Sequence, residues 1–232
     1  AQCLPPMVDW PDDIREAVGG HYWMAKGGHE FDGREINALD MTELDDIAAQ
    51  IGAAGIETVA ISSIFSPVND NMERRAMAQM QKRLPNANFT LSSEIGRLGI
   101  LERENAAIMN ASLRALSRKT VDAFGKALEQ VGLTCPYYIT QNDGTLMNRD
   151  FVQAYPVLTF ASGPTNSMRG ASFLSGEADA IVVDIGGTTT DVGALVKGFP
   201  RQASTTVDVG GVRTNFRMPD VYSCLLYTSD AA

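Results

Sequence analysis

Residues 180–191 read Ala-Ile-Val-Val-Asp-Ile-Gly-Gly-Thr-Thr-Thr-Asp. The apolar run at 180–183 predicts a buried strand, which leads without a break into two adjacent glycines. Residues 192–196 again suit a strand, so the stretch 184–191, named here the glycine loop, is predicted to form the tip of a β-hairpin. No helix is expected after the glycines and no Gly-Lys-Ser/Thr is present, so the loop is neither a P-loop nor a Rossmann fingerprint.

The residue types of the glycine loop suit a phosphate group. Glycines let backbone N–H groups approach an oxyanion closely, and threonine hydroxyls add donors. The predicted phosphate-binding residues are Gly186, Gly187, Thr188, Thr189 and Thr190. Asp184 is the predicted Mg²⁺ ligand, through water, because Mg²⁺ keeps much of its hydration shell. Asp191 is predicted to orient a water, hold the loop or bind the metal, and both aspartates are candidate catalytic residues.

The competing interpretation of this stretch is an ordinary β-hairpin with a glycine turn, in which threonine is simply a good strand residue. Two aspartates bracket the loop, and a run of polar residues and glycines directly follows the apolar strand. These two features together favour phosphate binding.

The rest of the chain predicts an α/β fold, because strands and helices alternate up to residue 180. A helix is expected at 41–51 with Leu44, Ile47, Ala48 and Ile51 on one face, and Thr42 with Asp45 as its N-terminal cap pair. Further helices are predicted at 71–84, 102–131 and 162–174, and further strands at 58–62, 89–92, 136–140 and 203–209. The last strand ends at Gly210-Gly211, a weaker candidate for close approach to a ligand.

Composition excludes several classes of partner and site. The formal net charge is −9, from 19 basic and 28 acidic residues, and no basic run exceeds two residues, so neither nucleic acid nor an anionic membrane is an expected partner. No apolar run approaches the roughly 18 residues that span a bilayer, and residues 1–10 show no secretory signal. Cys3, Cys135 and Cys224 are too far apart for a metal site, which favours reduced thiols in a cytoplasmic protein. His21 and His29 are expected in exposed loops.

Both ends of the sequence are unusual. The chain begins without Met, and residues 224–232, Cys-Leu-Leu-Tyr-Thr-Ser-Asp-Ala-Ala, resemble the translation of a transposon-end adapter used in sequencing libraries. We therefore expect a fragment that is open at both ends. The tail at 224–232 is expected to pack poorly and to have no role. A genuine short C-terminal segment is the alternative.

The glycine loop resembles the Asp-x-Gly-Gly-Thr-x-Thr-Asp loop of the hydantoinase/oxoprolinase family. It is also similar to the second phosphate loop of heat-shock chaperone ATPases, sugar kinases and actin. The resemblance extends over residues 28–221 and includes the small-residue helix that begins at Ser162-Gly163-Pro164 and runs through Gly170-Ala171. Weaker matches are Ser92-Ser93-Glu94, Arg103-Glu104, Asn110-Ala111 and Gln141-Asn142-Asp143-Gly144. The sequence departs from the family at Thr165-Asn166-Ser167 and at Asp143-Gly144-Thr145, where paired glycines are common.

The resemblance implies a partial actin-like (ribonuclease H-like) ATPase fold. Residues 1–160 would be the remainder of a first domain, and residues 161–223 the connecting helix and the start of a second, which contains the phosphate-loop hairpin. The implied activity is ATP- and Mg²⁺-dependent hydrolysis of a cyclic amide, of hydantoin or 5-oxoproline type, through a phosphorylated carbonyl. A hydantoinase B-type subunit is an implied partner.

An earlier Asp-Gly-Gly-Thr loop, common in the family, does not precede residue 180, so the fragment is expected to be inactive by itself. The alternative function is a non-enzymatic actin-like module, in which nucleotide controls assembly or partner binding. Such a module needs the same loop, so the loop does not distinguish the two functions.

Overall fold

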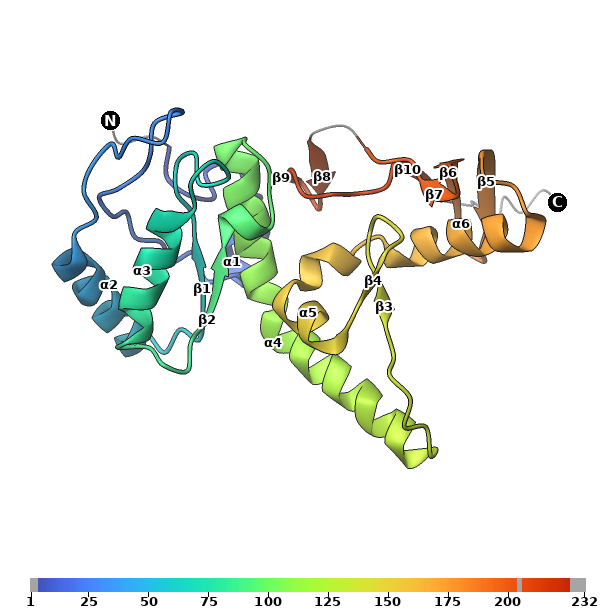
Figure 1. The fold of residues 1–232 in the computed structure, drawn as a ribbon, viewed down its shortest axis with the longest axis horizontal. Coiled ribbons are helices and arrows are strands. Elements are labelled where there is room, and N and C mark those ends of the chain that lie inside the picture. Colours follow the sequence, from blue (N-terminus) through green and yellow to red (C-terminus); the bar gives the residue numbers. More distant parts are fainter. Residues whose placement is uncertain (1–3, 204–205, 226–232) are drawn as a thin grey trace. The chain divides into compact units, whose positions relative to one another are not determined.

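The computed structural model describes residues 4–203 and 206–225, and the chain forms two compact units (Figure 1). Unit 1 comprises Ala1–Lys119 and Thr206–Phe216, and unit 2 comprises Thr120–Thr205 and Arg217–Ala232. Both units contain helices and strands, which confirms the α/β class. The domain boundary predicted at residue 160 stays a prediction.

Unit 1 is built on two parallel strands, β1 (Thr58–Ile61) and β2 (Asn88–Leu91), joined through helix α3 (Asn71–Gln81). Helix α2 (Met41–Ala53) packs with α3 against them. The four residues predicted for the buried face of α2 are all buried, because the 3.6-residue period aligns them along one stripe. The core of this layer consists of Leu44, Ile47, Ala48, Ile51, Ala76, Met80 and Phe89.

The predicted cap of α2 is wrong. Asp40 is the N-cap residue, and its side chain accepts hydrogen bonds from the backbone N–H groups of Thr42 and Glu43 at 3.0 and 3.2 Å. Asp40 has extended backbone angles, whereas Thr42 already lies in the first turn. A side-chain oxygen at the N-cap satisfies backbone N–H groups that have no partner within the helix.

We expect Asp40→Ala to lower the free energy of unfolding by about 1 kcal/mol, since two backbone N–H groups of the first turn lose their acceptor. Thr42→Ala, at the position predicted from sequence, is expected to change it by less than about 0.5 kcal/mol. Urea unfolding followed by circular dichroism measures both variants. Equal losses would contradict the assignment of the cap to Asp40.

Unit 1 also contains helix α1 (Asp12–Ala17), the 3₁₀ turn η1 (Ser92–Glu94), the first part of helix α4 (Ile100–Gln130) and the hairpin of β8 (Val207–Val209) and β9 (Val212–Thr214). The single strand predicted at 203–209 is therefore wrong in its extent, although residues 204–205 lie outside the described part. Positive φ angles at Gly210 and Gly211, +64° and +83°, turn the chain back at this point.

A second hydrophobic cluster holds this hairpin in unit 1. Val212, Met7 and Trp10 are buried together, and the half-buried Ile108 and Met109 of α4 pack against them. The indole Nε1 of Trp10 donates to the Oδ1 atom of the buried Asn105 at 2.8 Å. A tryptophan N–H that is buried in this way is satisfied, so the cluster carries no unpaired indole donor.

A buried polar network joins the carboxyl ends of β1 and β2. The carboxylate of Glu73, 1% exposed, accepts four hydrogen bonds at 2.6–3.0 Å, from the backbone N–H groups of Ser63 and Ser93 and the hydroxyls of Ser92 and Ser93. Four donors thus satisfy the oxygens of a carboxylate that has been removed from water.

The cation of the same network is Arg103, which is fully buried. Its Nε donates to Ser92 Oγ at 2.9 Å. Its two terminal nitrogens donate to the carbonyl oxygens of Arg97, Leu98 and Ser63 at 2.9, 2.9 and 2.6 Å. Arg103 and Glu73 attract each other through this network, so neither charge is uncompensated.

Glu104, the next residue of α4, gives unit 1 a pH dependence. Burial raises the pKa of its carboxyl to about 7 from an ordinary 4.5; the attraction of Arg103 opposes this rise, and the repulsion of Asp9 adds to it. Between these two pH values the folded protein keeps a proton that the unfolded chain has lost. The free energy of unfolding therefore falls as the pH rises from 4.5 to 7.

We expect Glu104→Gln to flatten this fall, because the amide does not titrate. The slopes of unfolding free energy against pH of the variant and the wild type should differ by the value for one bound proton at most. Chemical unfolding at half-unit steps from pH 4.5 to pH 7.5 measures it, with Glu57→Gln, an exposed glutamate of the same unit, as the matched control. Parallel curves for Glu104→Gln and the wild type would contradict the burial of this carboxyl.

Unit 2 begins with the end of α4 and continues through the hairpin of β3 (Ile139–Thr140) and β4 (Leu146–Met147), helix α5 (Arg149–Ala154), the 3₁₀ turn η2 (Pro156–Thr159) and helix α6 (Ser162–Ser175). The strand predicted at 136–140 is thus shorter than expected. Val121, Met147 and Val152 form the core of this part, with Tyr137, Ile139 and Leu158 packed around them. The hydroxyl of Tyr137 donates to the carbonyl oxygen of Val121 at 3.2 Å.

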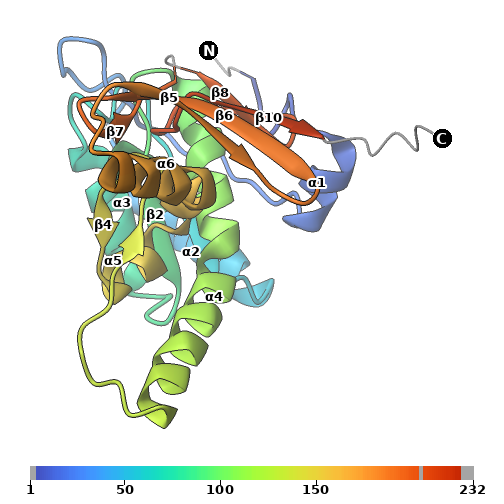
Figure 2. The same cartoon turned by 90° about the vertical axis from the view of Figure 1, so that its right-hand side faces the viewer.

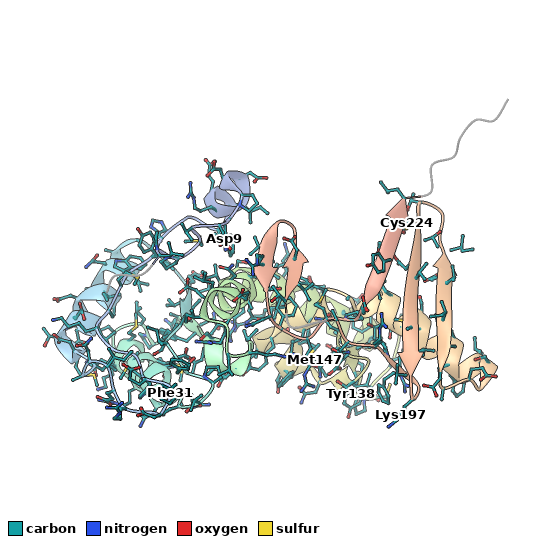
Figure 3. All side chains as sticks on the ribbon, turned by 90° about the horizontal axis from the view of Figure 1, so that it is seen from above. Asp9, Phe31, Tyr138, Met147, Lys197 and Cys224 are labelled. Carbon is teal, nitrogen blue, oxygen red and sulfur yellow. The ribbon has the colours of Figure 1, made fainter. Side chains whose placement is uncertain are left out.

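The antiparallel sheet of unit 2 has the strand order β10-β6-β5, and β7 (Phe199–Pro200) pairs with the end of β6. Its strands are β5 (Ala180–Ile185), β6 (Thr189–Val196) and β10 (Val221–Leu225), which run side by side with α6 next to them (Figure 2). Cys224 near the end of β10 and Lys197 after β6 lie at opposite ends of this sheet (Figure 3).

Helix α6 packs on one face of this sheet, at Gly193 of β6. A Cβ atom at Gly193 would lie 2.6 Å from Met168 Sδ, so the missing side chain makes room for the helix. The other face is open: Ile181, Val183 and Ile185 are 70%, 52% and 71% exposed. The strand predicted to be buried is therefore buried on one face only.

Two further predictions are corrected or limited by the structure. His29, expected in an exposed loop, is 2% exposed, because its backbone pairs with Ile64 and with Glu35. The predicted tail begins inside β10, where Cys224 and Leu225 pair with Thr190 and Thr189, and the Leu225 side chain is 66% exposed. Residues 226–232 of that tail lie outside the described part of the chain.

Candidate functional site

The glycine loop is the tip of the β5–β6 hairpin, as predicted. The backbone N–H of Gly186 donates to the carbonyl oxygen of Thr189 at 2.9 Å and closes the turn. Gly186, Gly187 and Thr188 are exposed. The tip of the turn at Gly187 and Thr188 is thus accessible to a ligand, as a phosphate-binding turn requires.

Asp184 and Asp191 are brought together by the strand register. They are directly opposite each other on β5 and β6, and Ser223 of β10 lies opposite Asp191 on its other side. Side chains of directly opposed residues project from the same face, with Cβ atoms about 4.5–5.5 Å apart. The three side chains therefore form one row across the sheet. The Ser223 hydroxyl donates to Asp191 Oδ1.

Gly193 and its partner Val182 lie on the face that α6 covers. Asp191 is two residues from Gly193 and Asp184 is two residues from Val182, and residues two apart on a strand project on the same face. The row therefore lies on the face that α6 covers. Both carboxylates are half-buried. Within residues 4–203 and 206–225, neither forms an ion pair, and the Asp184 side chain accepts no hydrogen bond. Like charges directly opposed on a sheet repel each other. The pair is therefore suited to a cation.

The predicted threonines divide between the two faces of the hairpin. Thr189 is two residues before Asp191 and so projects on the face of the aspartates. Thr190 lies opposite Ile185 and projects on the open face. The register thus places Thr189, but not Thr190, on the side of the carboxylate pair.

Gly210 and Gly211 lie in unit 1, in the turn between β8 and β9, whereas the glycine loop lies in unit 2. The backbone N–H of Gly211 donates to Asp208 Oδ1 at 2.8 Å, and a Cβ atom at Gly211 would lie 3.0 Å from Pro11 Cγ. The absence of a side chain at Gly211 therefore makes room for Pro11. A ligand-binding role for the two glycines stays a prediction.

Sequence reasoning missed Ser223, because its position beside Asp191 depends on the register of β10. It also missed the polar cluster at Asn142, whose residues the sequence indicates only as a weak family match, Gln141-Asn142-Asp143-Gly144. In that turn the Asp143 carboxylate accepts hydrogen bonds from Thr145 and faces Arg217 at 3.4 Å. Burial alone would raise the pKa of Asp143, but these bonds and Arg217 hold that pKa below its ordinary value.

Residues 4–203 and 206–225, the described part of the chain, contain neither a cluster of metal ligands nor a membrane span. No group of three or more His, Cys, Asp or Glu side chains is arranged to hold a metal ion. No helix is both long and apolar enough to cross a membrane. Cys135 and Cys224 are free and exposed.

Comparison with known families identifies the class. The family model described as hydantoinase/oxoprolinase matches residues 103–224, more than half of the chain, and the model of the hydantoinase/oxoprolinase N-terminal region matches residues 7–84. The chain belongs to the hydantoinase/oxoprolinase family, as the glycine loop indicated.

Two curated relatives are similar over most of the chain. The caprolactamase subunit alpha of Pseudomonas jessenii is 25% identical over 89% of this chain. The uncharacterized protein MJ0964 of Methanocaldococcus jannaschii is 26% identical over 77% of it. In both cases the match covers 27% of the relative, so the chain spans about a quarter of the length of these proteins.

Two solved structures share the fold. The ATP-dependent caprolactamase from Pseudomonas jessenii superposes with a TM-score of 0.73 and 21% identity, over 91% of this chain and 35% of that one. The nucleotide-free acetone carboxylase superposes with a TM-score of 0.70 and 19% identity, over 92% of this chain and 32% of that one.

Proposed function

We propose that this chain supplies the second phosphate-binding loop of an ATP-dependent cyclic amidohydrolase with an actin-like fold. The observation that carries the proposal is the pair Asp184 and Asp191, directly opposed beside an exposed glycine turn and without a cationic partner among the described residues. Family membership and the names of the relatives, above all the ATP-dependent caprolactamase, support a cyclic amide as the substrate.

The carboxylate pair fits Mg²⁺, which is usually held by one or two carboxylates together with waters and substrate phosphates. Asp184 would hold the ion, directly or through water, and Asp191, fixed by Ser223, would hold it or orient a water. The backbone N–H of Gly187 and the hydroxyls of Thr188 and Thr189 would contact phosphate, while the Gly186 N–H holds the turn closed. When bound, Mg²⁺ neutralises charge that develops on the phosphoryl group.

The proposed reaction starts with attack of the amide carbonyl oxygen on the γ-phosphorus of ATP, with ADP as the leaving group. Water then adds to the activated carbon, the ring C–N bond breaks, and the nitrogen takes up a proton as it leaves. A second water releases phosphate from the acyl phosphate. The chain's contribution is to position the phosphoryl group and to stabilise its charge.

The test is ATP turnover by the full-length protein with its neighbouring B-type subunit, in the presence of hydantoin, 5-oxoproline or caprolactam. We expect one of these rings to stimulate phosphate release, with one ring-opened product per phosphate. ATP binding without stimulation by any cyclic amide would favour the alternative, a nucleotide-controlled assembly module. We further propose that the 232-residue chain alone binds Mg-ATP weakly or not at all, and calorimetry measures this binding. We also propose that the protein is cytoplasmic.

A further inference from the structure

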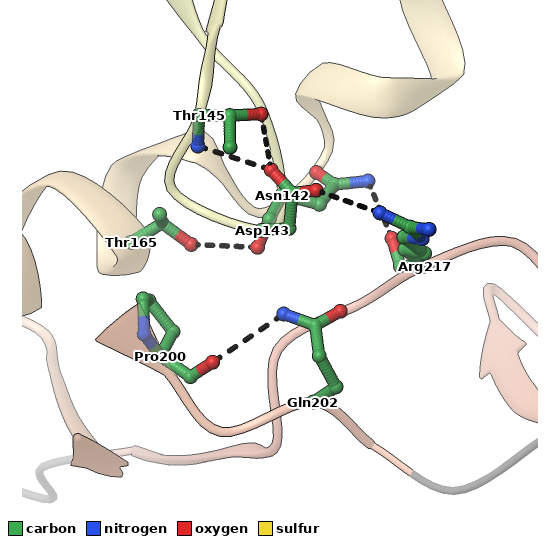
Figure 4. Close-up of polar contacts among 7 residues, drawn as sticks. All are labelled: Asn142, Asp143, Thr145, Thr165, Pro200, Gln202 and Arg217. Atoms are coloured by element: carbon green, nitrogen blue, oxygen red, sulfur yellow. Dashed lines mark hydrogen bonds and ion pairs between the residues drawn. The ribbon is translucent and has the colours of Figure 1, made fainter. Parts of the chain in front are cut away.

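The turn between β3 and β4 contains the buried side chain of Asn142, which is 1% exposed. Figure 4 shows its contacts with Thr165 and Arg217, beside those of the neighbouring Asp143. Its Oδ1 accepts from the backbone N–H of Ala161 at 2.8 Å, and its Nδ2 donates to the carbonyl oxygens of Val157 and Arg217 at 3.2 and 3.1 Å. Both N–H groups of the amide and its oxygen are thus used.

The backbone of Asn142 adds two hydrogen bonds to the same surroundings. Its N–H donates to the carbonyl oxygen of Leu158 at 2.8 Å, and its carbonyl oxygen accepts from the Thr165 hydroxyl at 3.1 Å. One buried residue therefore joins η2, the first turn of α6, and the segment that leads into β10. Aspartate in its place would lack the donors for two carbonyl oxygens, so the position requires an amide.

Both attached segments continue to the carboxylate pair. Helix α6 packs through Met168 against Gly193, two residues from Asp191 on the same strand face. The segment after Arg217 becomes β10, which pairs with β6 and places Ser223 against Asp191. Helix α6, which packs beside the row of Asp184, Asp191 and Ser223, and the segment that leads into β10, which carries Ser223, are thus both attached to one residue, Asn142.

We infer that Asn142 is a positioning residue for the carboxylate pair of the glycine loop. It contacts neither aspartate, and it acts through α6 and β10. This inference rests on the proposed function for its catalytic consequence, but its structural consequence is separate and is tested separately.

The catalytic consequence is tested with Asn142→Ala in the full-length protein. We expect kcat to fall on the order of ten- to a hundredfold, because small displacements of catalytic groups reduce rates by such factors. The KM for Mg-ATP should change little, since the backbone donors of the glycine turn remain. Asn148→Ala is the matched control: Asn148 caps α5 by accepting from Phe151 N–H at 2.9 Å, a contact that lies outside α6 and the β5–β6 hairpin. A rise in KM at constant kcat would overturn the inference.

The structural consequence is tested by hydrogen exchange on the 232-residue chain, which needs no activity. Asn142→Ala should speed exchange of backbone amides at 161–168 and 189–193 by about ten- to a hundredfold, while Asn148→Ala leaves these segments unchanged. If Asn142→Ala does not fold, Thr165→Val, which removes only the bond to the Asn142 carbonyl, should give a smaller rise in the same segments. Unchanged exchange there, or an equal rise throughout unit 2, overturns the inference. Normal exchange effects without any ATP turnover by the wild type would refute the proposed function alone.

Discussion

Asp184→Asn should lower ATP turnover of the full-length protein by about 10²–10³-fold while the fold is retained. The substitution keeps the shape of the side chain and removes its charge, and the loss of one central electrostatic contact typically has this effect on the rate. The free energy of unfolding should stay unchanged or rise by about 0.2–1 kcal/mol, because the repulsion between Asp184 and Asp191 disappears. Turnover and chemical unfolding are measured on one preparation.

The matched control is Asp179→Asn at the other end of the same hairpin. Asp179 accepts a hydrogen bond from the Lys197 backbone N–H at 3.0 Å and lies just before β5, at the end of the strand away from the glycine turn. ATP turnover of the Asp179→Asn variant should remain close to that of the wild type. If Asp184→Asn keeps normal turnover but unfolds more easily, Asp184 has a structural role and the proposed site is wrong.

Arg103→Met should lower the free energy of unfolding by about 3–5 kcal/mol, the cost of removing one partner from a buried charge pair. Methionine fills much of the volume, but the Glu73 carboxylate then remains buried without a cation. The carbonyl oxygens of Ser63, Arg97 and Leu98 also lose their donor. Urea unfolding of the chain measures the loss through the signal of unit 1, for example the fluorescence of Trp10.

Arg213→Met serves as the control for the loss of an arginine charge. Arg213 pairs with Glu102 at 3.0 Å, but its side chain is 62% exposed, so the substitution should cost less than about 1 kcal/mol. A loss of similar size for both variants would contradict the central role of Arg103. Unchanged stability of Arg103→Met would show that the network is dispensable.

Elements with a strong local pattern could be predicted from the sequence. The apolar period of α2 identified its buried face, and the two glycines after an apolar run identified the β5–β6 hairpin. The cap of α2 was assigned to the wrong residue because Asp40 and Thr42 are both good cap residues, and only the backbone angle at Asp40 distinguishes them. The apolar sequence of a strand also does not show whether other elements pack on one or both of its faces. The exposure of Ile181 and Ile185 was therefore not predicted.

The candidate site was predictable in its residues and not in its arrangement. Asp184 and Asp191 were identified from their positions around the glycines. The row that they form with Ser223 depends on the pairing of β10, and Ser223 is 32 residues from Asp191. The tie from Asn142 to Arg217 spans 75 residues and involves a backbone carbonyl, which has no sequence signature at all.

The placement of the β8–β9 hairpin has a consequence for biosynthesis. Unit 1 is made of two separate stretches of chain, and Val212 and Phe216 of the second stretch are buried in it. A ribosome therefore releases Met7 and Trp10 long before the residue that covers them, and unit 1 cannot complete its core while the chain is still short of residue 216. Nascent chains of intermediate length expose this apolar surface to chaperones, and unit 1 completes its core only after much of unit 2 has been synthesised.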